Sequence, residues 1–251
     1  MKAIIMAAGV GSRLSEISSG KPKCLIKAAG ETLIKRIVRV CSSRGIDDVT
    51  VITGYEKDLI HEELGQAVEF AYNPFYPVTN SISSLWLTRE KLKGDVILMN
   101  ADLFFEPSLL DALLRQRKSV VMLSDSTRIK TADYRFCFKG DQITHYGKHL
   151  SNSQTDGEYV GMARIDSSFT ERFLTRLENM IEQGRTNSWW EEVLYSFIPQ
   201  GVPIYHHDVA GTFWTEIDDP KDYDRLQAWL RGRTSSITSS AIGTSPMPAI
   251  R

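Results

Sequence analysis

The chain has 251 residues, with 30 basic and 31 acidic side chains and a formal net charge of −1. A balance this even argues against broad electrostatic binding of nucleic acid, so any basic site must be local. No stretch approaches 18 uninterrupted apolar residues, and the three cysteines are widely spaced, which argues against a membrane span and a disulfide framework. We therefore expect a cytoplasmic protein that is neither secreted nor inserted in a membrane.

The first half of the chain alternates the patterns of buried strands and amphipathic helices. Residues 2–8 are an apolar run typical of a buried strand, and residues 31–45 carry apolar side chains at helical spacing up to Gly45. Further elements are predicted as strands at 48–53, 68–72 and 95–100, and as helices after Gly54 and over 81–92. This order predicts a mostly parallel sheet flanked by helices, with ligands bound beyond the carboxyl ends of the strands.

The second half of the chain is predicted to contain antiparallel strands. Gly140 and Asp141 separate two strand patterns, at 134–139 and 142–146, which predicts a hairpin. The remaining elements are expected as strands at 158–165 and 204–208, a further stretch at 211–218, and helices at 168–183, 188–198 and 220–230.

The end of the chain differs in composition. From Thr234 it is rich in Ser and Thr, with prolines and few large apolar residues, which is typical of a mobile tail. We expect one domain over 1–232, with halves at 1–130 and 131–232, and a flexible tail over 233–251.

The first predicted strand ends in the stretch Ala7-Ala8-Gly9-Val10-Gly11-Ser12-Arg13. Glycines leave backbone N–H groups accessible, so an anionic oxygen could approach this loop closely. The spacing lacks the third glycine of the dinucleotide fingerprint, and no GxxxxGK[ST] pattern occurs around it. The alternative is a tight turn whose glycines only relieve strain. Residues 15–20 are predicted to form an extended loop.

Two lysines follow in Lys21-Pro22-Lys23-Cys24-Leu25, where Pro22 stiffens the backbone. A guanidinium from Arg13 and an ammonium from Lys23 that converge on a glycine-rich loop suit a polyphosphate, because Arg grips two oxygens while Lys acts as a compact charge.

Together these two stretches resemble the signature of the nucleotidyltransferases that couple nucleoside triphosphates to sugar phosphates and polar-head phosphates. The family often has Pro-x-Thr after the Arg-Leu pair, where this chain has residues 15–18. The resemblance covers residues 1–230 and implies a Rossmann-like α/β fold with a smaller antiparallel part that binds the acceptor. It assigns catalysis to Arg13 and Lys23, and nucleotide binding to a loop comprising Ala7, Ala8, Gly9, Gly11 and Ser12.

Two aspartates are candidate ligands of Mg²⁺. Asp102 follows the strand at 95–100, and Asp218 stands in Glu216-Ile217-Asp218-Asp219-Pro220. Taken alone, such an aspartate could equally be a cap or turn residue. The resemblance implies that both hold magnesium, which prefers oxygen ligands. Asp219 is the neighbouring candidate, although its place before Pro220 also fits a helix N-cap.

Within the family, the motifs are most similar to CTP-dependent enzymes that activate phosphocholine or 2-aminoethylphosphonate. The motifs that carry this resemblance are Thr53-Gly54-Tyr55, Asn80-Ser81, Glu158-Tyr159-Val160-Gly161-Met162, Trp189-Trp190-Glu191-Glu192 and Glu216-Ile217-Asp218. The resemblance implies that Gly54, Asn80 and Ser81 lie near the nucleotide. For Asn80 and Ser81 a helix cap is the alternative.

The candidates for the acceptor site are Tyr159, Trp190, Glu191 and Glu216. An aromatic face beside a carboxylate can hold an ammonium group by cation–π attraction and charge. The alternative is that the tryptophans belong to the core.

The predicted reaction is transfer of CMP from CTP to a small phosphate or phosphonate, with Mg²⁺ as cofactor and pyrophosphate as product. The attacking oxygen is already ionised, so no general base is required, and His206 and His207 are interpreted as structural. One alternative is a sugar-1-phosphate nucleotidyltransferase that uses UTP, dTTP or GTP. A lesser alternative is a nucleotide-binding module without turnover.

Overall fold

The computed structural model describes residues 1–11 and 14–241. Ser12 and Arg13, two residues of the predicted phosphate loop, lie outside the described residues, as do residues 242–251 of the predicted tail. The roles of Ser12 and Arg13 therefore stay predictions.

Among the described residues, nine strands form one mixed sheet in the order β5-β4-β1-β6-β11-β8-β12-β10-β9. Its first four strands are mutually parallel, as predicted: β5 Glu69–Tyr72, β4 Asp48–Thr53, β1 Lys2–Ala7 and β6 Val96–Asn100. These strands are rich in β-branched and apolar residues, which suits a sheet covered on both faces. Their carboxyl ends share one edge, where the predicted glycine loop begins.

The sheet continues into the second half of the chain. Strand β11 Gly157–Ile165 pairs antiparallel with β6 and with β8 Val120–Asp125. The remaining strands are β12 Tyr205–Asp208, β10 Gln142–Tyr146 and β9 Arg135–Lys139. The predicted hairpin is confirmed as β9 and β10. Because β9 also pairs with β11, this antiparallel part belongs to the same sheet.

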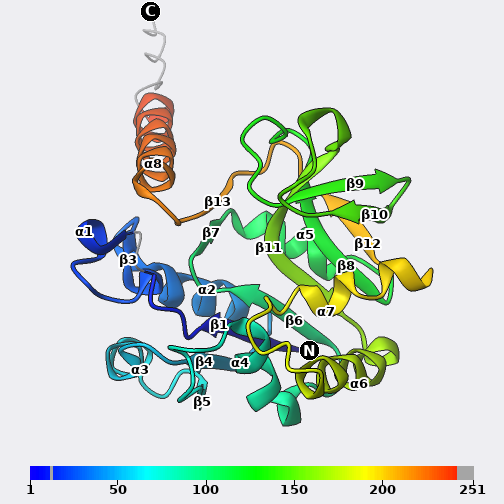
Figure 1. The fold of residues 1–251 in the computed structure, drawn as a ribbon. Helices are drawn as coiled ribbons and strands as arrows, with labels where there is room; N and C mark the ends of the chain where they lie inside the picture. Colours follow the sequence, from blue (N-terminus) through cyan, green and yellow to red (C-terminus); the bar gives the residue numbers. More distant parts are fainter. Residues whose placement is uncertain (12–13, 242–251) are drawn as a thin grey trace, which may run out of the picture.

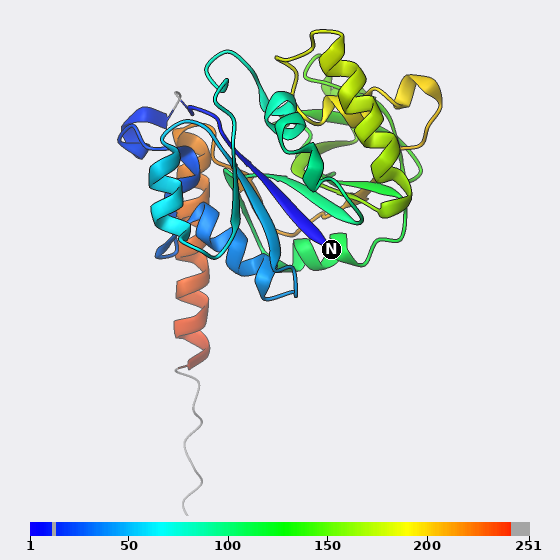
Figure 2. The ribbon, with the colours of Figure 1, turned by 90° about the horizontal axis from the view of Figure 1, so that it is seen from below.

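Two sets of helices cover the two faces of the sheet (Figure 1, Figure 2). One core cluster contains side chains of α2 Leu33–Ser42, α3 Lys57–Leu64 and α5 Pro107–Leu114. The other contains side chains of α4 Ser81–Leu87, α6 Ser167–Glu182 and α7 Glu192–Tyr195. The sheet is therefore buried between two helical layers, and the predicted fold class is confirmed.

A third, smaller apolar cluster contains residues from an early and a late segment of the chain. Strands β7 Leu103–Phe105 and β13 Trp214–Glu216 pair antiparallel, and helix α8 Pro220–Ala241 follows. Leu226 of α8 packs with Leu14 and Phe104 in this cluster. Short elements complete the fold: α1 Ser15–Ser18, η2 Lys23–Leu25, β2 Lys27–Ala28, β3 Glu31–Thr32, η3 Arg89–Lys91, η4 Asn152–Gln154 and η5 Ile198–Gln200.

Several predicted elements differ from the observed ones. Residues 15–18 form one helical turn, α1, where an extended loop is predicted, and Ile17 packs against the third cluster. The helix predicted over 188–198 is limited to α7, because the backbone before it bonds to α4: Ile82 N donates to Ser188 O, and Trp190 N donates to Ser81 Oγ. Strand β8 and helix α5 are observed where no element is predicted.

The closing helix is longer than predicted. Helix α8 runs to Ala241, so the first residues of the predicted tail are helical, and the helix projects away from the body of the molecule (Figure 1). The division of the chain into halves and a flexible tail stays a prediction.

Two further features concern the cysteines and the length of the apolar helices. Cys24 and Cys41 are buried and unbridged, whereas Cys137 is partly exposed. Within the part of the chain that is described, no helix has the length and apolar character needed to cross a membrane.

Leu98 tests the packing of the central strand. Its side chain is fully buried in β6, opposite Ile4 of β1 and Ala163 of β11. Leu98→Ala should lower the free energy of unfolding by about 2–5 kcal/mol, because it removes buried methyl groups and leaves a cavity. Urea denaturation measures this loss, with Val78→Ala as control, since Val78 is 70% exposed. A loss below about 1 kcal/mol for Leu98→Ala would contradict the packing described.

Candidate active site

Three adjoining pockets lie beyond the carboxyl ends of β1 and β6, and Asp102 lines all three. The loop pocket is lined by Met6, Ala7, Gly9, Gly11, Pro22, Lys23, Cys24, Ala101 and Asp102. The helix pocket is lined by Met6, Ala8, Gly9, Tyr76, Thr79, Asn80, Ser81, Asn100, Asp102, Trp189 and Glu191. The acidic pocket is lined by Asn100, Asp102, Asp133, Tyr134, Lys148, Tyr159, Trp189, Glu191, Tyr195, Glu216 and Asp218.

Lys23 contacts both predicted metal aspartates where the loop pocket adjoins the acidic pocket. Its Nζ forms an ion pair with Asp218 Oδ1 and lies 3.9 Å from Asp102 Oδ2. All three side chains are largely buried, with 13% of Lys23, 26% of Asp102 and 27% of Asp218 exposed. In such surroundings the ammonium attracts both carboxylates more strongly than it would in water. The predicted cation and acids therefore meet at one point.

The two glycines of the loop serve different purposes. Gly11 has φ +65°, and a Cβ on it would lie 2.5 Å from Lys23 Cγ. Only glycine therefore allows both this backbone conformation and the position of Lys23. At Gly9 a Cβ would meet no described atom within 4 Å. The strain-relieving interpretation thus applies to Gly11, while Gly9 leaves the backbone open to the pocket.

The residues at this point fit a magnesium ion that is also held by ligand oxygens. Mg²⁺ commonly binds one or two carboxylates together with substrate phosphates and waters. Asp102 and Asp218 supply two carboxylates next to the same ammonium. Among the residues that the structure describes, no group of three or more His, Cys, Asp or Glu side chains is placed to hold a metal. A metal here would depend on the phosphates of a bound ligand.

Asp219 acts as a cap, which was the alternative to a metal role. Its Oδ1 accepts hydrogen bonds from the backbone N of Lys221 and of Asp222. In return, Asp222 Oδ2 accepts from the backbone N of Asp218 and of Asp219. This reciprocal capping fixes the backbone of Asp218 at the start of α8.

Ala8, Asn80 and Ser81, three of the candidates for nucleotide binding, line the helix pocket, and Asn80 also caps α4. Asn80 Oδ1 accepts from Ser81 N at 2.7 Å, and Ser81 Oγ accepts from Trp190 N at 2.9 Å. Gly54 supports the loop from behind, because a Cβ on it would lie 2.6 Å from Ala8 O and 2.8 Å from Tyr76 Cβ. Its role is therefore close packing rather than contact with a ligand.

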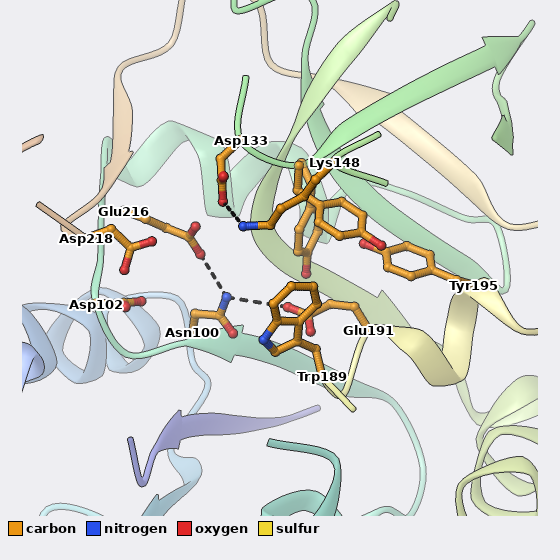
Figure 3. A pocket seen from close by; sticks show the side chains of 11 residues that line it. Asn100, Asp102, Asp133, Lys148, Trp189, Glu191, Tyr195, Glu216 and Asp218 are labelled. Carbon is orange, nitrogen blue, oxygen red and sulfur yellow. Dashed lines mark hydrogen bonds and ion pairs between the residues drawn. The ribbon is translucent and has the colours of Figure 1, made fainter. Parts of the chain in front are cut away.

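The acidic pocket is a cavity of about 200 Å³ with carboxylates and aromatic rings on its walls (Figure 3). Tyr159, Glu191 and Glu216, three of the candidates for the acceptor site, line it. Trp190 does not have the predicted position: its side chain is fully buried in the core. The neighbouring Trp189, which is 42% exposed, lines the pocket. The pocket therefore offers an aromatic surface beside buried carboxylates.

Trp190 nevertheless shapes this pocket through Asn100. Trp190 Nε1 donates a hydrogen bond of 3.0 Å to Asn100 Oδ1. The other end of the amide, Nδ2, then faces the carboxylates and donates to Glu216 Oε1 at 2.8 Å and to Glu191 Oε1 at 3.5 Å. Because the indole nitrogen is only a donor, it fixes the orientation of the amide.

Glu191 and Glu216 are buried, and burial disfavours the ionised form of a carboxyl group. Burial raises the pKa of Glu191 to about 8. Burial, and then the charge of Asp102, raise the pKa of Glu216 well above its ordinary value. A cation that enters the pocket would favour the ionised form of both glutamates and pair with it. The pocket is therefore suited to a ligand with a positive charge.

Sequence reasoning missed several residues of this pocket. Asn100 ends β6 at the ligand edge of the sheet, a position that could have revealed it. Asp133 and Lys148 come from irregular segments on either side of the β9–β10 hairpin, and no spacing in the sequence indicates them.

A family model described as the MobA-like NTP transferase domain matches residues 3–193. The chain is 26% identical to the choline-phosphate cytidylyltransferase of Streptococcus pneumoniae, over 92% of this chain and 99% of that protein. It is 27% identical to the CMP-5'-(3-aminopropyl)phosphonate synthase of Streptomyces rubellomurinus, over 88% of this chain but only 37% of that longer protein.

A solved structure of the CTP:phosphocholine cytidylyltransferase from Streptococcus pneumoniae has the same fold. It superposes with a TM-score of 0.73 at 22% identity and covers 91% of this chain and 98% of that one.

Glu191 makes stability depend on pH. Its ordinary pKa of 4.5 applies to the unfolded chain, and its pKa in the fold is about 8. Between these values the unfolded chain loses the proton first, so the free energy of unfolding should fall as pH rises. Glu191→Gln should reduce this fall by about 1 kcal/mol or more between pH 5.5 and 8.

Urea denaturation at several pH values measures this effect. The matched control is Glu182→Gln, at the exposed end of α6, which should keep the wild-type pH dependence. Equal pH dependence in Glu191→Gln and wild type would show that Glu191 is ionised in the fold over this range.

Proposed function

This chain belongs to the MobA-like NTP transferase domain family, and from that premise we propose that it transfers CMP from CTP to a small phosphate or phosphonate with a cationic head group. Pyrophosphate is the second product. The observation that carries this proposal is the meeting of Lys23, Asp102 and Asp218 at a glycine loop that adjoins the acidic pocket. The names of the two relatives support it, since one joins a cytidylyl group to choline phosphate and the other joins CMP to an aminopropylphosphonate.

The loop pocket and the helix pocket suit the nucleotide. Gly9, Gly11 and Lys23 line the loop pocket, where backbone N–H groups and an ammonium could neutralise a triphosphate. The helix pocket adjoins it through Met6 and Gly9, and Asn80 and Ser81 offer polar atoms to a ribose or base. We assign the triphosphate to the first and the nucleoside to the second, and we retain the proposed phosphate contacts of Ala7, Ser12 and Arg13.

The acidic pocket suits the head group of the acceptor. Trp189 presents an exposed aromatic surface, and Glu191 and Glu216 supply carboxylates. An ammonium group here gains cation–π attraction and charge pairing in a partly desolvated site. Its phosphate or phosphonate would then point toward Asp102, which lines all three pockets.

Positioning and charge neutralisation account for the chemistry. The acceptor oxygen is ionised at neutral pH, so it attacks the α-phosphorus without a general base while pyrophosphate leaves in line. Lys23 stabilises the negative charge that develops on the phosphate oxygens. Mg²⁺, when held by Asp102 and Asp218, would supply further neutralisation of the phosphates.

We propose a cytoplasmic location, because Cys24 and Cys41 are unbridged and free thiols persist under reducing conditions.

A substrate panel tests the reaction. Pyrophosphate release should be fastest with CTP and with phosphocholine or 2-aminoethylphosphonate, and it should require Mg²⁺. UTP, dTTP or GTP with a hexose 1-phosphate form the competing arm. A preference for that arm would identify a sugar-phosphate nucleotidyltransferase, and binding of CTP without release in either arm would identify a module without turnover.

Gly11→Ala tests the loop. The added Cβ should displace Lys23, with which it would overlap, and lower kcat/KM by at least tenfold. Both Gly11→Ala and the control Gly20→Ala should lose about 1 kcal/mol of stability, because both glycines have positive φ.

The control separates strain from displacement, because a Cβ at Gly20 would meet no described atom within 4 Å. Gly20→Ala should therefore keep its kcat/KM, while Lys23→Ala sets the scale of full loss. Steady-state kinetics and urea denaturation give both readouts. Equal kcat/KM in the two glycine variants would refute the contact between Gly11 and Lys23.

A further inference from the structure

Lys148 places an ammonium group inside the acidic pocket (Figure 3). It stands between β10 and η4, and its Nζ lies 2.7 Å from Asp133 Oδ2. The same Nζ lies 5.3 Å from the centroid of the Trp189 ring, which is within the range of a cation–π contact. Lys148 therefore makes the two kinds of contact that a bound ammonium group would make in this pocket.

The charges around this ammonium explain its position. Five of the lining residues are acidic: Asp102, Asp133, Glu191, Glu216 and Asp218. Lys148 is the one basic side chain among the described residues that line the acidic pocket. Acidic side chains attract a cation, so they favour the inward position of Lys148 over a position in solvent.

We propose that Lys148 is a tethered competitor for the head group of the acceptor: its ammonium takes the place over Trp189 and beside Asp133 until a cationic acceptor displaces it. This inference rests on the proposed function. Lys148 then sets the affinity for the acceptor without contributing to the chemical step, because it opposes acceptor binding alone.

The contacts of Lys148 are weak enough to be exchanged. The exposed fraction is 47% for the Lys148 side chain and 64% for Asp133, so water screens their ion pair. Trp189 is also partly exposed. Lys148 can therefore move into solvent without opening the core, and a cation that enters the pocket replaces both of its contacts.

Binding of a simple cation tests the proposal without any turnover. Tetramethylammonium chloride is titrated against the full chain, and tryptophan fluorescence reports binding near Trp189. Lys148→Met removes the charge and keeps the length of the side chain. It should tighten binding by roughly threefold to tenfold. The control Lys139→Met removes the same charge from an exposed position at the end of β9 and should match wild type.

The outcomes separate this inference from the proposed function. Tighter binding in Lys148→Met supports the tethered competitor, even if no cytidylyl transfer is found. Unchanged or weaker binding, or no binding by any variant, overturns it.

Kinetics give a second readout where transfer is found. The KM for phosphocholine or 2-aminoethylphosphonate should fall in Lys148→Met by a similar factor, while kcat and the KM for CTP stay the same. A rise in the acceptor KM would mean that Lys148 contacts the anionic part of the acceptor, and it would overturn the inference while leaving the proposed function intact.

Discussion

The ion pairs of Lys23 with Asp102 and Asp218 join three distant parts of the chain. Lys23 lies in the loop after β1, Asp102 follows β6, and Asp218 precedes α8. Two carboxylates brought together in a partly buried place repel each other unless a cation lies between them. The glycine at position 11 is required for this cation to lie where it does, since any side chain there would overlap Lys23. One ammonium group therefore links the start of α8, the glycine loop and the edge of the sheet.

The direction of the hydrogen bonds made by Asn100 is a second constraint, and it shapes the acidic pocket. Trp190 is buried, and its only polar atom donates to Asn100. The amide of Asn100 must then direct its own donors at Glu216 and Glu191. Gly161 completes this arrangement, because a Cβ on it would lie 2.7 Å from Glu216 Oε1. The carboxylates are thus held in one geometry before any ligand arrives, which is the condition for a selective site.

Strand β6 connects the two sites to which these constraints apply. Asn100 is its last residue and Asp102 lies just beyond its end, so one strand carries a residue of the acidic pocket and a residue of the ion-pair centre. The spacing between the two is set by a buried strand that is paired on both sides. The distance between the acidic pocket and the ion-pair centre is therefore maintained by the sheet.

The sequence by itself determined the order of the elements and the class of the site. Continuous or alternating apolar residues indicate strands, helical spacing of apolar residues indicates helices, and glycines indicate turns. From these patterns β1, β4, β6 and the β9–β10 hairpin could be predicted closely. Asp102 and the loop from Ala7 to Gly11 follow strands whose carboxyl ends share an edge. The roles of Lys23, Asp102 and Asp218 are indicated by the resemblance of their motifs to a family, because an aspartate taken alone could equally be a cap or turn residue. These are local properties of the chain.

Only the tertiary structure decided which of two adjacent tryptophans lines the acidic pocket. Trp189 and Trp190 carry the same chemistry, and their positions follow from the bond between Trp190 N and Ser81 Oγ, made across 109 residues of sequence. The same holds for Lys148 and Asp133, which meet only because the β9–β10 hairpin brings the segments before and after it together. A contact between distant segments produces no periodic pattern in the sequence. Neither partner could therefore be identified from its neighbours along the chain.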